Sequence, residues 1–249
     1  MNILIAMKQV PDLQQVRIRD RRPILDDVPL LMGDIDRSAL AAAVALQEAA
    51  AGKKIVLSAG DGNLEDTVKE ALAAGADEAV LVIDDRLRDA ESAFSACALA
   101  EAIRRTEDVG LVLFGEGSAD NYSCQVMSRV AGLLGWPQAG YVREIRLEDG
   151  KAVLTRSLED REEILEVDLP AVVSVVSEIA QPQTHSVTAI LKAGRKPKTV
   201  FRLADLGLDG PQPKAVETLD QLAPQSERKK VVLKSVEELI SVLRSKEKP

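Results

Sequence analysis

The sequence contains few of the residues from which catalytic and metal sites are usually built. It has one histidine, His185, and two cysteines, Cys97 and Cys124, which lie far apart and form no CxxC pair. Any Ser-His-Asp or Cys-His catalytic set would have to use His185, which falls in a polar stretch. We therefore expect no catalytic residue, no metal site and no disulfide framework, and we expect a reducing, cytoplasmic location.

Aromatic residues, net positive charge and long apolar runs are scarce as well. Only 2% of the 249 residues are aromatic, so the core must be built from alanine, valine, leucine and isoleucine. The net charge of −8 argues against a general binder of nucleic acid or anionic membranes. The apolar start, residues 1–11, is too short for a signal peptide or a membrane span. We expect a soluble protein that is not integral to the membrane.

What the sequence does have is a regular alternation of apolar runs and alanine-rich amphipathic stretches. The runs at residues 3–7, 54–58, 79–83 and 111–114 are typical of buried strands, and helices are predicted at 36–51, 64–74, 90–105 and 123–134. Asp36 and Asn63 are interpreted as helix caps. Strands alternating with helices of this length predict an α/β fold with a Rossmann-like parallel sheet flanked by helices.

The pattern changes after Gly135. Alternating segments at 141–147 and 152–158 surround Asp149-Gly150, a hairpin turn signal, and another extended run follows at 163–167. An apolar run at 171–176 favours a return to the main sheet. We therefore predict one α/β domain over residues 1–179, with an antiparallel excursion at about 141–168.

The remaining residues, 180–249, are polar and interrupted by prolines, which is typical of an extended arm rather than a second core. Such an arm normally becomes ordered by lying on another chain. Ser235 and Glu238 form a capping box that predicts a short helix near the end. This C-terminal arm is expected to wrap a partner subunit.

Two glycine-containing turns follow predicted strands and precede predicted helices, at residues 58–62 and 115–120. At this edge of a parallel sheet nucleotides bind, and glycine lets the backbone approach a phosphate. The turns could equally need glycine for their geometry alone. The sequence has neither a Walker A loop nor a GxGxxG motif, so an ordinary NAD-binding domain is excluded.

Five segments, taken in order, resemble the beta subunits of electron transfer flavoproteins. They are the Lys-x-Val-Pro-Asp opening at 6–12, the helix and Gly-Ala-Asp exit at 65–77, the nucleotide loop at 120–126, the Trp-Pro-Gln turn at 136–138 and the Ile-Leu-Lys-Ala segment at 189–197. The chain departs from the family pattern in three places: Gly33-Asp34, Asn121-Tyr122 and Gln181-Pro182-Gln183.

The resemblance implies an α/β fold of the adenine-nucleotide-binding type that pairs with an alpha subunit. In this family the beta subunit holds AMP, or a second FAD in electron-bifurcating members, while the working FAD lies mainly on the alpha subunit. Carried over by position, the nucleotide pocket comprises Ala6, Lys8, Ser58, Gly60, Asp120, Ser123, Gln125 and Val126. A recognition loop at 184–192 would dock flavin-dependent dehydrogenases through Val187, Ile190, Leu191 and Lys192.

Electrons would then pass through FAD to a quinone reductase or another acceptor. Two alternatives remain open: an electron-bifurcating member with FAD in this subunit, and a stand-alone adenine-nucleotide sensor resembling universal stress proteins. Plainer interpretations of single residues also remain, with Lys8 as a surface lysine, Asp120 as a helix cap, Trp136 as a packing residue and Val187 as part of an ordinary loop.

Overall fold

The structure is a computed structural model that describes residues 1–46, 51–182, 184–210, 215–225 and 232–246. The chain divides into two units. The first comprises Met1–Val16 and Leu25–Thr218, and the second comprises Arg17–Ile24 and Leu219–Pro249. The candidate functional residues all belong to the first unit, which is described first.

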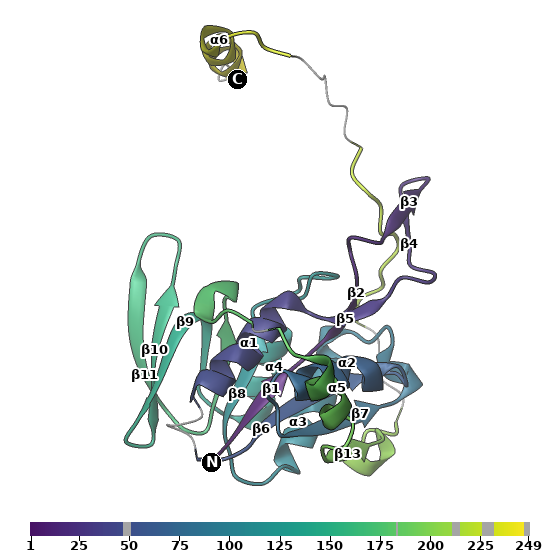
Figure 1. Cartoon of the computed structure of the whole chain (residues 1–249), viewed down its shortest axis with the longest axis vertical. Helices are drawn as coiled ribbons and strands as arrows, with labels where there is room; N and C mark the ends of the chain where they lie inside the picture. Colours follow the sequence, from purple (N-terminus) through teal and green to yellow (C-terminus); the bar gives the residue numbers. More distant parts are fainter. Residues whose placement is uncertain (47–50, 183, 211–214, 226–231, 247–249) are drawn as a thin grey trace. The chain divides into compact units, whose positions relative to one another are not determined.

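The first unit is built on a nine-stranded sheet, counted within the described residues, in the order β11-β10-β9-β12-β8-β1-β6-β7-β13 (Figure 1). Six neighbouring strands, from β12 to β13, run parallel to one another. They are β1 (Asn2–Ala6), β6 (Lys54–Gly60), β7 (Glu78–Ile83), β8 (Val109–Gly115), β12 (Ala171–Val175) and β13 (Lys198–Phe201). The predicted Rossmann-like parallel sheet is therefore confirmed.

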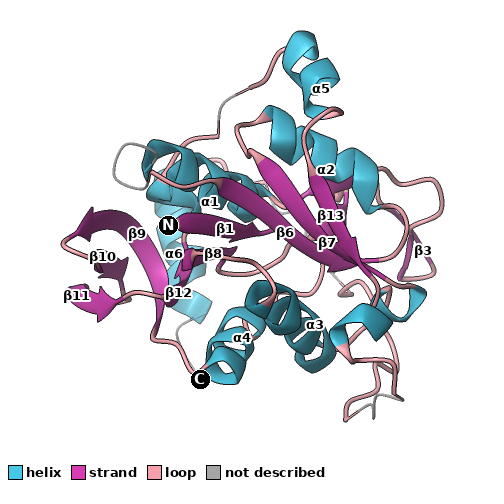
Figure 2. Ribbon diagram, turned by 90° about the horizontal axis from the view of Figure 1, so that it is seen from below, coloured by secondary structure: helices cyan, strands magenta, loops and turns pink. Residues whose placement is uncertain are grey.

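Helices cover both faces of this sheet, because successive side chains of a buried strand point to opposite sides. Ile3 and Ile5 of β1 pack in one core cluster with residues of α1 (Asp34–Ala45) and α2 (Leu64–Ala73). Leu4 and Ala6 pack in another cluster with α3 (Ser92–Arg104) and α4 (Val126–Leu134). Figure 2 shows the two helical layers on either side of the strands.

Two helices begin at positions that differ from those predicted. Gly33 is the N-cap of α1, so Asp36 lies inside the helix instead of capping it. Helix α4 begins at Val126 and not at Ser123, because Tyr122 (φ 46°) and Cys124 (φ 53°) adopt left-handed conformations that a helix cannot contain. The end predicted for the first helix, at residue 51, involves residues 47–50, which lie outside the described residues.

The antiparallel excursion is present as predicted. Strand β9 (Gln138–Glu148) runs parallel to β12 at its start and then pairs antiparallel with β10 (Lys151–Ser157), which pairs with β11 (Glu162–Asp168). Asp149 (φ 48°) and Gly150 (φ 79°) form the turn between β9 and β10. Positive φ at both central residues is the requirement of the hairpin turn that Asp-Gly favours.

The compact unit continues well beyond residue 179, where the sequence placed the start of the arm. Helix α5 (Val187–Ala193) packs on α2, β13 pairs with β7, and Leu203 and Leu206 are buried. Lys196 donates hydrogen bonds to the carbonyls of Leu72 (2.8 Å) and Ala76 (2.5 Å) at the end of α2. This part of the presumed arm is therefore integrated by long-range contacts that polar composition does not reveal.

A small antiparallel pair, β2 (Gln9–Pro11) and β5 (Leu30–Met32), completes the first unit. The second unit contains the hairpin β3 (Arg17–Arg19) and β4 (Arg22–Ile24), which the C-terminal segment contacts through an ion pair between Arg22 and Asp220 (3.0 Å). It ends in α6 (Val236–Lys246), where Ser235 Oγ accepts from the Glu238 amide, as the capping box predicted. Among the described helices, none has the length and apolar character needed to cross a membrane.

Candidate functional site

The strand order reverses between β1 and β8. From β1 the chain continues to β6 and β7, which lie on one side of β1 in the strand order. Helix α3 then leads back to β8, which lies on the other side of β1. In open parallel sheets ligands bind outside the carboxyl ends of the strands at such a switch point. The segments that follow β1 and β8, around Lys8 and residues 115–120, occupy this position.

Asp36 joins these two strand ends. Its carboxylate accepts hydrogen bonds from the backbone amides of Lys8 (2.8 Å) and Gly115 (3.3 Å), and its side chain is buried. Burial raises the pKa of Asp36 from 3.8 to about 7, although the hydrogen bonds from Lys8 and Gly115 oppose that rise. This role differs from the helix cap that the sequence pattern predicted for Asp36. Asp36, Ala39, Leu40 and Ala43 share one helical face by their spacing, so an acid on an apolar face was the available signal.

A second link crosses the switch point at the surface. Lys8 Nζ lies 2.7 Å from Asp120 Oδ2 and 3.4 Å from Ser118 Oγ. Burial alone would raise the pKa of Asp120, but the hydrogen bonds from Lys8 and Ser118 outweigh it and hold that pKa below its ordinary value. Two of the predicted nucleotide residues, Lys8 and Asp120, are thus brought together from distant parts of the sequence.

Three other predicted residues lie at the ends of β1 and β6 and have clear packing roles. Ala6 is buried, and Ser58 Oγ donates a hydrogen bond of 2.8 Å to the Met7 carbonyl. A Cβ atom at Gly60 would meet the Leu64 side chain at 3.1 Å. Ala6, Ser58 and Gly60 therefore pack inside the protein at the strand ends next to the switch point. Gly62 borders open space, because nothing lies within 4 Å of its Cβ position.

The last three predicted residues lead into α4. Gln125 Oε1 accepts hydrogen bonds from Ser92 Oγ (3.2 Å) and the Arg129 guanidinium (2.9 Å). Val126 packs partly buried against the cluster around α3 and α4, and Ser123 is half-buried. These residues hold the start of α4 against α3, next to the loop that carries Asp120.

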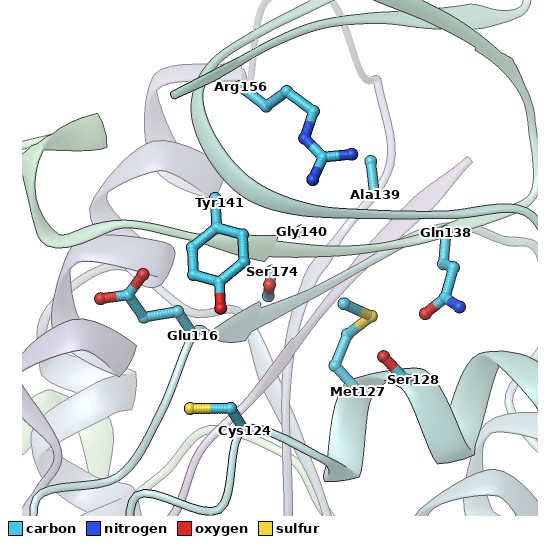
Figure 3. A pocket seen from close by; sticks show the side chains of 10 residues that line it. All are labelled: Glu116, Cys124, Met127, Ser128, Gln138, Ala139, Gly140, Tyr141, Arg156 and Ser174. Carbon is cyan, nitrogen blue, oxygen red and sulfur yellow. The ribbon is translucent and has the colours of Figure 1, made fainter. Parts of the chain in front are cut away.

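A cavity of about 340 Å³ opens beside this loop, near the carboxyl ends of β8 and β12 (Figure 3). The side chains of Arg156 and Tyr141 point into it, with Cys124 and Met127 on the opposite side. Within the described residues, Arg156 Nε is buried and has no hydrogen-bond partner, and the nearest carboxylate oxygen paired with it is Glu163 Oε2 at 3.9 Å. The volume is at the lower end of the range for small-molecule sites, and the guanidinium suits an anionic or carbonyl group.

Three non-glycine residues with positive φ lie in or next to the lining of this cavity. Tyr141 (φ 59°) and Cys124 (φ 53°) line it in left-handed conformations, and Tyr122 (φ 46°) lies between Cys124 and the Asp120 loop. The Tyr122 hydroxyl donates to Glu116 Oε1 at 3.0 Å, and its ring occupies the space that a side chain at Gly117 would need. Strained non-glycine residues persist where the surrounding structure holds them, often at binding sites.

Lys8 and the residues at 115–126 together have features that suit an adenylate, but the glycines in this segment are not among them. An exposed ammonium group and the Ser118 hydroxyl lie at the switch point, and an open cavity adjoins them. However, Gly115 and Gly117 are needed for packing within the chain. A Cβ at Gly115 would lie 2.6 Å from Asp36, and one at Gly117 would lie 2.8 Å from the Tyr122 ring. The suitability for a nucleotide therefore rests on Lys8 and the cavity rather than on these glycines.

The predicted docking residues lie together on α5, so the segment predicted as a loop contains a short helix that Ser186 caps through the Ala189 amide. The side chains of Val187 and Leu191 are 73% and 72% exposed, and Ile190 and Lys192 are exposed as well. Ala193 of the same helix is buried against the main core. One side of α5 is thus anchored while its apolar residues face outward.

Comparisons with known proteins identify relatives of this chain. The family model for the electron transfer flavoprotein domain matches residues 25–206. The chain is 36% identical over 211 residues to the caffeyl-CoA reductase-Etf complex subunit CarD of Acetobacterium woodii. This match covers 84% of this chain and 80% of the relative.

Two further relatives are named as beta subunits of electron transfer flavoproteins. The protein of Thermoanaerobacterium thermosaccharolyticum is 35% identical over 92% of this chain and 90% of its own length. The mitochondrial protein of Oryza sativa subsp. indica is 32% identical over 98% of both chains. The chain therefore belongs to the beta-subunit family of electron transfer flavoproteins, and its role lies in electron transfer together with a partner subunit.

Proposed function

We propose that this chain is the beta subunit of a heterodimeric electron transfer flavoprotein that binds an adenine nucleotide at the switch point between β1 and β8. The observation that carries the proposal is the convergence of Lys8 and Asp120, whose side chains meet at 2.7 Å beside the carboxyl ends of these strands. The Lys8 side chain is 48% exposed. A lysine ammonium has three N–H donors, so a phosphate at that edge can accept from one that Asp120 does not use, and the 115–126 loop supplies further polar groups.

The nucleotide is AMP or the adenylate part of a second FAD. FAD supplies redox chemistry that no side chain of this protein can provide, whereas the protein binds, orients and shields it. The cavity next to residues 122–128 favours the second candidate, because AMP would not need the space that Arg156 and Tyr141 line. The residues Ala6, Ser58, Gly60, Ser123, Gln125 and Val126 would shape the pocket mainly by packing.

We further propose that α5 docks flavin-dependent dehydrogenases. Val187, Ile190 and Leu191 present apolar side chains next to Lys192, and apolar anchors beside exposed charges suit brief, electrostatically steered encounters. Electrons would leave for a quinone reductase or another acceptor. The proposed location is the cytoplasm, in keeping with free thiols at Cys97 and Cys124.

The C-terminal segment supports an obligate alpha subunit. Helix α6 carries five exposed apolar side chains, Val236, Leu239, Ile240, Val242 and Leu243. Apolar residues at this density on a short exposed helix are typical of an interface. We propose that they contact the alpha subunit, in an interface of about 2,000 Å² or more.

The experiment is co-expression with an electron transfer flavoprotein alpha subunit from the same organism, followed by quantification of flavin and AMP in the purified heterodimer. One flavin and one AMP per heterodimer would support the simple carrier, and two flavins without AMP would support the second candidate. A soluble, flavin-containing monomer obtained without the alpha subunit would contradict the heterodimer, and a heterodimer with one flavin and an empty beta subunit would contradict the nucleotide site.

A further inference from the structure

One buried carboxylate ties together the two strand ends that border the site. Asp36 belongs to α1, yet its two oxygens accept hydrogen bonds from the Lys8 amide after β1 and from the Gly115 amide at the end of β8. Its side chain is 8% exposed, so water does not replace these partners. The Lys8 amide lies just after β1 and the Gly115 amide is the last of β8, and the regular pairing of these two parallel strands ends at Ile5 and Leu113.

We propose that Asp36 is a positioning residue for the nucleotide site, holding the ends of β1 and β8 at a fixed separation so that Lys8 and the 115–120 loop face the same ligand. Asp36 acts through Lys8 and Gly115 and does not need to touch the nucleotide. The inference rests on the proposed function, because it names the residue that sets the geometry of that site.

The Asp36 carboxylate lies close to the backbone of two glycines. A Cβ atom at Gly115 would lie 2.6 Å from Asp36 Oδ1, and one at Gly33 would lie 3.1 Å from Oδ2. Glycines therefore flank both oxygens of the carboxylate. The aspartate already places both oxygens at hydrogen-bond distance from the two amides, so the extra methylene of glutamate would displace them, and we expect glutamate to substitute poorly for Asp36.

The charge of Asp36 matters as well as its shape. The ionised form accepts from both amides, whereas a protonated carboxyl has one oxygen that carries a hydrogen and accepts poorly. The charged groups whose fields act on it are Lys8, which favours ionisation, and Asp120, which opposes it. On its own helix, Arg37 is bound to Glu70 (2.8 Å) and Asp34 (2.6 Å). Burial places the pKa of Asp36 at about 7, so its link to the two amides weakens as the pH falls through neutrality.

The test measures AMP binding by the nucleotide-depleted heterodimer, using calorimetry at pH 8 and pH 6. Asp36→Asn replaces one accepting oxygen with an amide group and should raise the AMP dissociation constant about tenfold at pH 8, the loss expected for one misdirected buried group. The ratio between variant and wild type should shrink toward one at pH 6, and the titration of AMP itself cancels from this ratio. Asp34→Asn is the matched control, because Asp34 lies in the same helical turn with a side chain that is 92% exposed. Its ratio should stay within twofold.

The outcomes separate the two proposals. A wild-type heterodimer that binds neither AMP nor FAD would contradict the proposed function. A wild type that binds, together with an Asp36→Asn variant of equal affinity at both pH values, would overturn the positioning role alone, as would a ratio that does not change with pH.

A second measurement needs no variant, in case Asp36→Asn fails to fold. Hydrogen exchange of the Lys8 and Gly115 amides in the wild-type heterodimer should lose protection as the pH falls from 8 to 6. The reference is the Arg37 amide, which donates to the Gly33 carbonyl at 3.0 Å and does not involve the carboxylate. Unchanged relative protection of both amides would overturn the proposal.

Discussion

Lys8 Nζ lies 2.7 Å from Asp120 Oδ2, and this ion pair connects the segment after β1 with the loop after β8. The two residues are 112 positions apart in the sequence. Beneath them, Asp36 connects the same two segments through backbone amides. The switch point of the sheet is therefore bridged twice, once at the surface by side chains and once in the interior by a carboxylate.

Replacing Lys8 should affect the ligand far more than the fold. Lys8→Met removes the cation, so we expect nucleotide affinity to fall about tenfold or more, measured by calorimetry on the heterodimer. The pair is partly exposed, so its loss should change the free energy of unfolding by less than about 1 kcal/mol. Lys53→Met, which removes an exposed pair with Glu78 far from the site, is the control and should leave affinity unchanged. Equal effects of both variants would contradict the role of Lys8.

Two glycine-to-alanine variants should have opposite effects on stability. At Gly115 the new Cβ would lie 2.6 Å from Asp36 and 3.1 Å from Ile35, so Gly115→Ala should destabilise the protein by about 1–3 kcal/mol. Gly132 lies inside α4 with nothing within 4 Å of its Cβ position, so Gly132→Ala should stabilise it by about 0.5–1 kcal/mol. Chemical denaturation of the heterodimer measures both. Stability gained at Gly115 would show that its backbone is less confined than the structure indicates.

The stability of the fold should depend on pH through Asp36. Its folded pKa of about 7 lies above the ordinary value of 3.8, so between these values the folded state holds a proton that the unfolded state releases. The free energy of unfolding should therefore decrease as the pH rises from about 4 to about 7 and level off above that. A pKa difference of this size corresponds to about 4 kcal/mol as an upper bound.

Denaturation of wild type and Asp36→Asn across this pH range isolates the contribution, because other titrating groups cancel in the difference. The wild type should lose stability relative to the variant as the pH rises. A difference that is flat with pH would mean that Asp36 titrates at its ordinary value.

Substitutions on α5 should slow electron transfer without unfolding the protein. Leu191→Asp places a charge at an apolar position that is 72% exposed, so docking should weaken while stability changes little. We expect the second-order rate of reduction by a flavin-dependent dehydrogenase that reduces the wild-type heterodimer to fall at least tenfold. Ile164→Asp on β11, at a side chain that is 70% exposed, is the matched control. A similar loss in both variants would point to a general charge effect instead of docking by α5.

Arg156 provides a way to separate the two candidate nucleotides. Arg156→Met removes the guanidinium that points into the cavity and keeps much of the side chain's volume. If the cavity holds part of a second FAD, the variant should bind FAD about tenfold more weakly in the nucleotide-depleted heterodimer, whereas AMP affinity should stay within twofold. Titration followed by flavin fluorescence measures the first and calorimetry the second. Unchanged FAD affinity would exclude a role for Arg156 in holding it.

The sequence by itself determined the order and kind of most elements in the first unit. Buried strands such as β6 and β8 appear as continuous apolar runs, and the amphipathic periodicity of α2 and α3 is local to each helix. The turn at Asp149-Gly150 and the capping box at Ser235 were also predictable, because their chemistry is complete within four residues. Family motifs located the candidate site for the same reason, since each is a short contiguous segment.

Only the tertiary structure decided how these segments meet. The role of Asp36 depends on two amides that belong to other elements, and the integration of Lys196 depends on carbonyls about 120 positions away at the end of α2. The late start of α4 follows from the left-handed conformations of Tyr122 and Cys124, which non-glycine residues adopt only rarely. Local patterns record what a segment prefers. The free energy that positions the buried Asp36 or the segment around Lys196 comes from neighbours that are close in space and distant in sequence.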